Sequence, residues 1–451
     1  MRKLIYYTIL SLLTLSLGSC DDNLNIEPEQ DLSPDVATSS SSNIRNILNN
    51  IYNEARDNDS YGGGIAMASD LLGDNGDVSW NGTYTQPAEY SEKAIISDNV
   101  YVEDIWMNAY EITNPSNIVL ANLDVFEDED LRNLTEGEAK FLRGLAYFDL
   151  VRLFAKPYEK GQTNSQLAVP IVLEPVIDAS GITKPPRNTV EEVYAQVLND
   201  LNEAYSLLPE SNNTHADKYA VKALLARVYL QMGDYENARD AADEVIMESP
   251  YVLTSDFASA FNNNENSPED IFAWQVTSQD ESINSFNEFW AGQAYGGRSG
   301  NPDISINEEH FAIYDDPEDE RGLFFYETSR LVATTKWQSQ FANIPFIRLA
   351  EMYLIRAESN FRLNTEIGAS PTDDINVLRK RANASEFDAV DLDTILLERQ
   401  RELSFEGFAL FDAKRLKRSV GEIPYNSNRL VLPIPLREMD ANPNLEQNPG
   451  Y

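Results

Sequence analysis

The chain has 451 residues, of which 74 are Asp or Glu and 35 are Lys or Arg, so its formal net charge is −39 at pH 7. A surface this acidic repels phosphate backbones and anionic lipid headgroups, which excludes nucleic acid as an expected partner. One cysteine and two histidines cannot form a disulfide framework or a zinc site of the usual types. The hydrophobic content of 42% supports a large buried core, in one big domain or two fused ones.

Residues 1–19 predict a lipoprotein signal peptide. They begin with a basic pair, continue with an apolar run and end in small residues, which is the pattern of an export signal. The apolar run is shorter than the roughly 20 residues that a membrane-spanning helix needs. The sequence LGSC at 17–20 resembles the bacterial lipobox, so we expect Cys20 to become the lipidated N-terminus. The alternative is an ordinary secretory signal that ends in an incidental cysteine.

The segment 20–42, which follows the signal, predicts a flexible tether. It is rich in Asp, Asn, Ser and Pro, a composition that favours an extended and mobile chain. Such a tether lets the folded body stand off the membrane.

Helical periodicity begins after the tether. The apolar residues that keep one helix face are Ile44, Ile47, Leu48, Ile51, Tyr52 and Ala55. Thr135 with Glu138, and Thr189 with Glu192, have the spacing of capping boxes and predict the starts of two longer helices. The first of these helices should stop at Pro157.

Residues 219–250 have the spacing of a tetratricopeptide repeat. Small residues at fixed positions let two antiparallel helices touch, and Pro250 ends the second helix. Fragments of the same pattern recur at 142–147 and 349–353, which favours a solenoid of helix pairs. Between about 251 and 345 this periodicity is replaced by Gly, Asn and Pro, so we expect long loops or an inserted lobe there.

Several segments together resemble one known family. They are the lipobox start, FLRGLAYFDLVRLF (141–154), RLAEMYLIRAE (348–358), INVLRKRAN (375–383), ERQRELSFEGFALFDAKRL (398–416) and the terminal LPIP…NPNLEQNPGY. Six pieces in this order resemble the SusD/RagB family over essentially the whole chain. The resemblance implies an all-α dominated fold of tetratricopeptide-like helical pairs with long loop-rich insertions. The SusD-like domain would span 43–451, with an N-terminal part of about 43–250 and a C-terminal part of about 251–451.

The same resemblance implies a function. Members of the family are cell-surface lipoproteins of the outer membrane that bind a nutrient, most often an oligosaccharide. They act without enzymatic activity as a hinged lid on a SusC-like TonB-dependent transporter. Acidic residues directly after the lipidated cysteine, here Asp21 and Asp22, are similar to the surface-export signal of such lipoproteins.

A glycan site needs flat aromatic faces against the sugar C–H groups, flanked by polar side chains that bond the hydroxyls. Two loop stretches have this composition, and in the family the ligand contacts come from the same two regions. The candidates in the first stretch are Asp70, Asp74, Asp77, Trp80, Asn81 and Tyr84. The candidates in the second stretch are Trp290, Tyr295, Arg298 and Trp337. For each aromatic residue the alternative is core packing or a contact to the transporter.

Other acidic motifs indicate less. The runs at 73–77 and 315–320 have the oxygen density of a Ca²⁺ site without its ligand order, so solvated turns are favoured over a structural cation. The run at 127–130 predicts an exposed loop. No cofactor is expected.

Three glutamates near the C-terminus and the two histidines are of residue types that often act in catalysis. Glu398, Glu402 and Glu406 recur every fourth residue beside arginines, which indicates surface or inter-helix ion pairs rather than an acid/base pair. His215 and His310 stand alone in polar, loop-like sequence.

Two other classes of function stay open. A glycan hydrolase would place two carboxylates about 5–10 Å apart across a cleft. A peptide- or protein-binding repeat scaffold would leave the concave face of the solenoid open instead of the loop region.

Overall fold

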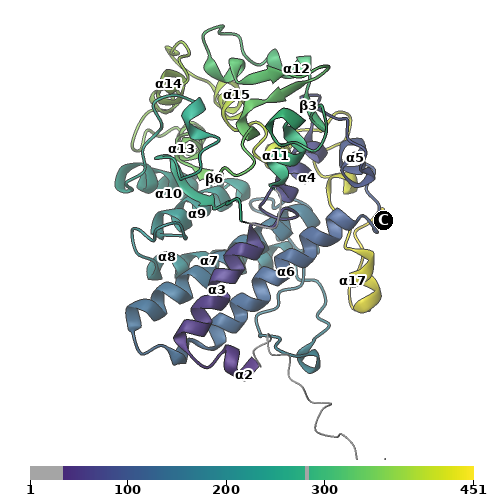
Figure 1. Ribbon diagram of the computed structural model, residues 1–451. Coiled ribbons are helices and arrows are strands. Elements are labelled where there is room, and N and C mark those ends of the chain that lie inside the picture. Colours follow the sequence, from purple (N-terminus) through teal and green to yellow (C-terminus); the bar gives the residue numbers. More distant parts are fainter. Residues whose placement is uncertain (1–33, 280–283) are drawn as a thin grey trace, which may run out of the picture.

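The structure is a computed structural model that describes residues 34–279 and 284–451. Helices dominate this part of the chain and the strands are short, as the sequence predicted (Figure 1). The expected signal peptide and Cys20 lie outside the described residues. The last part of the expected tether differs from the prediction, because α2 (Pro34–Ala37) and the start of α3 (Ser41–Ala55) are helical.

The remaining elements follow in chain order. The helices are α4 (Gly64–Gly73), α5 (Thr85–Glu92), α6 (Val100–Ala121), α7 (Glu129–Phe154), α8 (Val190–Leu207), α9 (Lys218–Met232), α10 (Tyr235–Glu248), α11 (Ser285–Trp290), α12 (Glu308–Phe311), α13 (Leu349–Leu363), α14 (Pro371–Arg381), α15 (Leu392–Leu403), α16 (Ala409–Arg415) and α17 (Leu436–Ala441). The strands are β1 (Val78–Trp80), β2 (Asp270–Trp274), β3 (Ile304–Ile306), β4 (Phe325–Glu327), β5 (Val332–Thr334) and β6 (Ile344–Arg348).

The long helices stack in a row, in which α3, α6, α7, α8, α9, α10 and α13 each contact the next. Figure 1 shows α3, α6, α7 and α8 in the lower half of the view, with α9, α10 and α13 above them. Two glycines of α7 allow its close contact with α8. At Gly144 an added Cβ would lie 3.1 Å from the side chain of Leu201, and at Gly137 it would lie 2.8 Å from the side chain of Leu208. The solenoid of helix pairs predicted from the sequence is therefore present.

The tetratricopeptide pattern is confirmed at α9 and α10. Gly233 ends α9 in the left-handed conformation, with φ of 71°, and its N–H donates to the carbonyls of Leu230 and Tyr229. Glycine adopts this conformation without steric cost, so the chain reverses into α10 within a few residues.

One of the two predicted capping boxes is real. Thr189 accepts from the N–H of Glu192 at the start of α8, and Glu192 bonds back to the N–H of Thr189. The prediction at Thr135 was wrong, because α7 begins earlier and this residue lies in its interior, where its hydroxyl donates to Leu131. The true N-cap of α7 is Asp128, inside the acidic run that we expected to be a loop.

Residues 251–345, expected to be loops or an inserted lobe, contribute most of the strands of two small sheets, between loops and short helices. One sheet has the strand order β1-β3-β5-β4 and the other pairs β2 with β6. Strand β1 belongs to the N-terminal part of the chain, so its pairing with β3 joins the two parts.

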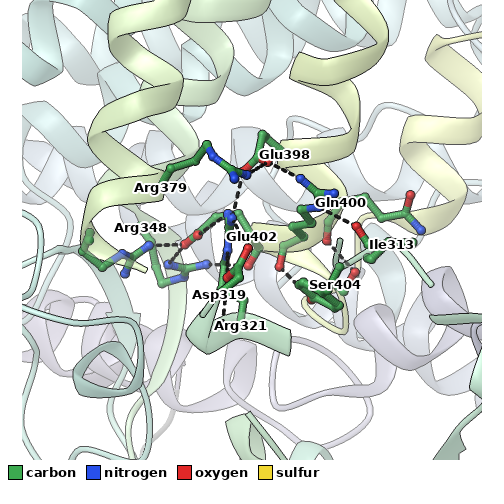
Figure 2. A network of polar contacts seen from close by, with 12 residues as sticks. Ile313, Asp319, Arg321, Arg348, Arg379, Glu398, Gln400, Glu402 and Ser404 are labelled. Atoms are coloured by element: carbon green, nitrogen blue, oxygen red, sulfur yellow. Dashed lines mark hydrogen bonds and ion pairs between the residues drawn. The ribbon is translucent and has the colours of Figure 1, made fainter. Parts of the chain in front are cut away.

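A buried network of ion pairs surrounds α15 (Figure 2). Glu402 contacts Arg348 at 3.0 Å, and Glu398 contacts Arg379 at 2.6 Å and Arg321 at 2.9 Å. Burial alone would raise the pKa of Glu402, but the surrounding arginines outweigh burial and hold that pKa well below its ordinary value. These inter-helix ion pairs were expected, but they are fully buried and not at the surface.

The two histidines are not alone, contrary to the sequence-based expectation. The ring of His215 stacks on Tyr52 with centroids 4.2 Å apart, and its Nδ1 lies 3.0 Å from Glu138. His310 is buried, with Nδ1 3.0 Å from Asp77. Both side chains have structural partners.

Candidate functional site

The candidate site forms where β1 pairs with β3. Trp80 lies opposite Ile304 in this antiparallel pair, and the N–H of Asn81 donates to the carbonyl of Asp303 at 2.6 Å. The pairing brings residues that are more than 200 positions apart in the sequence to one place. Figure 1 shows α11 beside β3, with α4 below them in the view and α5 to the right.

Four aromatic rings gather at this junction, and we call them the aromatic cluster: Trp80, Tyr84, Tyr101 and Phe289. The ring of Phe289 lies at the centre, 5.9 Å from Trp80 and 6.3 Å from Tyr84 between centroids. Tyr101 meets the edge of Tyr84 at 6.5 Å. Tyr84 is 40% exposed, so the cluster presents an aromatic ring to solvent on a packed base.

Gly82 is required by the shape of this cluster. A Cβ at this position would lie 2.4 Å from the indole of Trp80, closer than any real contact. The chain between β1 and Tyr84 can therefore fold over the Trp80 ring only because residue 82 has no side chain.

Arg298 adds a polar group to the cluster. Its guanidinium carbon lies 4.1 Å from the centroid of the Tyr84 ring, a cation–π contact. Its Nε donates to Asp303 at 2.7 Å, and Nη2 donates to Thr83 at 3.3 Å. These bonds fix the guanidinium over one face of the Tyr84 ring, where a ligand hydroxyl could accept from it.

A cavity of about 190 Å³, here called the site cavity, opens beside Tyr84. It is lined by Asn58, Asp59, Gly64, Met67, Tyr84, Tyr101, Ile105, Ser285, Glu288 and Phe289. Its walls come from the loop before α4, from α4 itself, from the start of α5, from α6 and from α11. The loop and α11 are joined by the N–H of Ser285, which donates to the carbonyl of Gly62 at 2.9 Å.

The site cavity is acidic. Burial, with the charges of Asp104, Asp57 and Glu288, raises the pKa of Asp59 to about 6. Burial also raises the pKa of Glu288, where Arg298 opposes the shift and Asp303 adds to it. Among the residues that the structure describes, neither carboxylate has an ion pair with a Lys or Arg side chain.

Two more of the expected residues lie at the same surface. The amide of Asn81 donates to Ser305 at 2.8 Å and to the carbonyl of Ser79 at 3.0 Å, and the residue is exposed. Tyr295 is 44% exposed and its ring packs edge-on against Tyr326 at 4.9 Å. Tyr295 lies on the loop that also positions Arg298.

Trp290 and Trp337 lie in the core, which corrects the expectation that they stack on a ligand. Trp290 is 1% exposed and packs against Phe405 with centroids 5.2 Å apart. Trp337 is 5% exposed, and its centroid lies 4.1 Å from that of Phe286. Neither ring has a free face for a sugar, so the alternative of core packing holds for both.

The first three acidic candidates lie elsewhere, at a second cavity of about 220 Å³ between α4, α15 and α16. Asp70 is buried and accepts from the N–H groups of Gly407 and Ala409, so it caps the start of α16. Asp74 accepts from the N–H groups of Gly76 and Val78 in its own turn. Asp77 contacts His310, so all three have structural partners.

The structure adds site residues that the sequence analysis missed, namely Asp59, Tyr101, Glu288 and Phe289. Phe289 is adjacent to Trp290, and the choice between the two depended on which side of α11 faces the cluster. Tyr101 and Asp59 had no sequence signal of their own, because only the packing of α6 and the loop before α4 brings them to Tyr84.

Within the described residues, no group of three or more His, Cys, Asp or Glu side chains is arranged to hold a metal ion. The described helices also include none with both the length and the apolar character needed to cross a membrane.

A helical-repeat scaffold that carries an exposed aromatic cluster beside a cavity is the architecture of a ligand-binding protein. The chain belongs to the SusD/RagB family. Residues 24–230 match the family model described as "Starch-binding associating with outer membrane", and residues 231–429 match the model of the SusD family. The predicted family is thus confirmed.

Two relatives of known sequence match most of the chain. SusD-like protein P2 of Formosa agariphila is 26% identical, over 97% of this chain and 98% of its own length. The starch-binding protein SusD of Bacteroides thetaiotaomicron is 24% identical, over 76% of this chain and 77% of its own. Both of these relatives, like the family models, carry names that describe binding proteins or SusD-like proteins and not enzymes.

Solved structures agree with the fold. A putative sugar-binding protein from Bacteroides vulgatus superposes with a TM-score of 0.81 at 29% identity, covering 92% of this chain and 99% of its own. A SusD superfamily protein from Bacteroides thetaiotaomicron gives a TM-score of 0.80 at 26% identity, covering 91% of this chain and all of its own.

Proposed function

We propose that the protein is a cell-surface lipoprotein that binds a glycan at the aromatic cluster and delivers it to a TonB-dependent transporter of the outer membrane. The observation that carries the proposal is the exposed ring of Tyr84, held on Phe289 and Tyr101 with Arg298 fixed over one of its faces. A flat ring gives a sugar its apolar contact, and the guanidinium and the Asn81 amide supply directed hydrogen bonds. The cavity beside Tyr84 adds room for a neighbouring sugar unit.

The relatives support a glycan as the ligand class. Two of them bear names that state starch binding or sugar binding, at 24% and 29% identity. Stacking on aromatic rings is tolerant of sugar identity, so these names support a glycan without naming the sugar or its linkage.

The transporter part of the proposal depends on the family. Lipidation at Cys20 would hold the protein at the outer membrane, and the family resemblance implies that the body moves there as a lid. A ligand favours closure of such a lid only if it binds the closed state more tightly than the open one. An acidic surface can also speed association with a basic partner surface.

A hydrolase is the second candidate, and one observation favours it. Asp59 and Glu288 both line the site cavity, and both have raised pKa values, which is a property of general acids in glycan hydrolysis. We nevertheless propose binding without hydrolysis. A peptide-binding scaffold would need an open face on the helical repeat and would not need the aromatic cluster.

The experiment is calorimetric titration of the purified protein with a panel of oligosaccharides, with chromatography of the sugars afterwards. Tyr84→Ala should weaken binding by about 1–3 kcal/mol, in analogy with bases stacked on aromatic side chains. The matched control is Phe361→Ala, which removes an exposed ring from α13 and should leave binding unchanged. Shortened sugars in the chromatography would favour the hydrolase over a binding protein. Tight binding that is unaffected at Tyr84 would refute the aromatic cluster as the site.

The transporter is tested separately. Affinity purification from native membranes in mild detergent should recover a TonB-dependent transporter in near-equal amount. Recovery of the protein alone would exclude the lid role and leave glycan binding standing.

A further inference from the structure

The site cavity carries an unbalanced negative charge, and this charge bears on which glycans the site can take. The inference depends on the proposed function, because it concerns the ligand of the same site. Asp59 and Glu288 line the cavity, and Asp57 and Asp104 lie close enough to act electrostatically on Asp59. The four carboxyl groups come from three separate elements, namely the loop before α4, α6 and α11.

The guanidinium of Arg298 does not neutralise these four carboxyl groups. Arg298 is committed to Asp303, whose carboxylate it contacts at 2.7 Å. It acts on Glu288 at longer range, and it does not figure among the charges that act on Asp59. In the described part of the chain no Lys or Arg side chain forms an ion pair with Asp57, Asp59, Asp104 or Glu288. The pair of Arg298 with Asp303 has no net charge, so the cavity stays negative.

The cavity is also partly enclosed, which strengthens the effect of the charge. Tyr84, Tyr101 and Phe289 form apolar walls, so the charges act in a medium of lower dielectric than water. The raised pKa of Asp59, about 6, reports both the burial and the mutual repulsion of these carboxylates. At pH 7.5 Asp59 is still mostly ionised, so an incoming anion meets a charged wall.

We propose that the site selects its glycan by charge: it accepts neutral and amine-bearing sugars and excludes sugars that carry carboxylate or sulfate groups. A carboxylate placed in the cavity would stand beside Asp59 and Glu288, and Arg298 is not among the residues that line it. A primary amine would instead meet two carboxylates, with Tyr84 and Tyr101 lining the same cavity. Asp59 and Glu288 are thus specificity-determining residues.

The test uses sugars that differ only at C6. Maltohexaose, cellohexaose, laminarihexaose and mannohexaose are each prepared unmodified, oxidised to the C6 carboxylate, and converted to the C6 amine. Affinities are measured at pH 7.5 and low salt for wild type and Tyr84→Ala. For a backbone whose binding requires Tyr84, the carboxylate form should bind at least about tenfold more weakly than the unmodified form, because opposed like charges are strongly unfavourable. The amine form should bind at least as tightly as the unmodified form.

Two double variants assign the effect to the cavity. Asp59→Asn with Glu288→Gln should bring the three forms to within about threefold of each other, because the opposing charge is gone. Asp393→Asn with Glu366→Gln changes the net charge equally at exposed positions on and near other helices, and should leave the discrimination intact. Added salt should weaken the discrimination only in proteins that keep the cavity charges.

The outcomes separate the two proposals. If a backbone binds through Tyr84 but its carboxylate form binds as tightly as the unmodified form, selection by charge is wrong and glycan binding stands. Selection by charge is also wrong if the cavity double variant discriminates as well as wild type. If no sugar binds in a manner that requires Tyr84, the proposed function fails and the charge selection fails with it.

Discussion

The indole N–H of Trp337 donates a hydrogen bond of 3.0 Å to the backbone carbonyl of Phe405. The bond joins the segment after β5, in the four-stranded sheet, to the turn between α15 and α16. Phe286 packs against the same indole. Trp337 is therefore a core residue that ties separate segments together, although its sequence context resembled a ligand-binding loop.

Trp337→Ala should lower the free energy of unfolding by about 3–5 kcal/mol, because it leaves a cavity and an unpaired carbonyl. Denaturant titration measures this effect. The glycan affinity of the protein that remains folded should not change. A variant with normal stability and weaker binding would instead return Trp337 to the ligand site.

Glu402 offers a prediction about the buried ion pairs of Figure 2. Glu402→Ala should cost about 3–5 kcal/mol of stability, because Arg348 and Arg381 would stay buried with less of their charge balanced. Glu366→Ala, at an exposed position, is the control and should have little effect. Equal unfolding midpoints for the two variants would show that the network adds nothing to stability.

The buried carboxyl group of Asp70 should make the free energy of unfolding depend on pH. Burial raises its pKa to about 7, although the N–H groups of Gly407 and Ala409 oppose the shift. The folded state then binds the proton more tightly than the unfolded state, so the contribution of Asp70 to the free energy of unfolding falls as pH rises from about 4 to about 7. Asp70→Asn should remove this part of the slope in denaturant titrations at a series of pH values.

The control for this slope is Asp391→Asn. Asp391 caps α15 at an exposed position, where its hydrogen bonds to Thr394 lower its pKa. Stability from such a group is lost only as pH falls through the acid range, so this variant should keep the slope assigned to Asp70. Identical slopes in wild type and Asp70→Asn would contradict the assignment.

At Gly73 we expect alanine to destabilise the protein, although alanine has the higher helix propensity. Replacing a helical glycine by alanine usually stabilises a helix by up to about 1 kcal/mol. At Gly73 the added Cβ would lie 2.1 Å from the backbone nitrogen of Leu410, so Gly73→Ala should destabilise the contact of α4 with α16 and lower the melting temperature. Gly300→Ala, where the Cβ meets nothing within 4 Å, should leave it nearly unchanged.

Cys20 predicts the mode of membrane attachment. If acylation alone holds the protein, Cys20→Ala should give a folded protein that no longer partitions into the detergent phase on phase separation, because each buried methylene of the lost chains had contributed about 0.8 kcal/mol. Circular dichroism checks that the helices are retained. A variant that still partitions into detergent would refute the lipobox prediction.

Much of the helical scaffold could be predicted from the sequence, because its signals are local. The apolar rhythm of α3, the capping box at Thr189 and the glycine turn at Gly233 are each contained within a few helical turns. The prediction at Thr135 failed because a threonine inside a helix can bond to the preceding turn, and the same pair spacing then occurs without a helix start. Asp128 was missed as the N-cap of α7 because it lies in the acidic run 127–130, whose charge suggested an exposed loop.

The candidate site could be predicted only in part, because its residues converge through tertiary contacts. Aromatic and polar residues in loops pointed to Trp80, Asn81, Tyr84 and Arg298, and the structure brings these four together. The same composition also pointed to Trp290, whose neighbour Phe289 is the one that contacts Tyr84. No pattern in one segment reveals which of two adjacent rings will face a partner from another segment.

The pairing of β1 with β3 has a consequence for engineering this protein. Trp80 and Tyr84 belong to the part matched by one family model, whereas Phe289 and Arg298 belong to the part matched by the other. A graft of either loop alone from a relative would therefore supply half of the aromatic cluster without the half that it packs against. Transfer of ligand preference between relatives should require both loops to be exchanged together, with glycine kept at position 82 so that the new chain can pass over the indole.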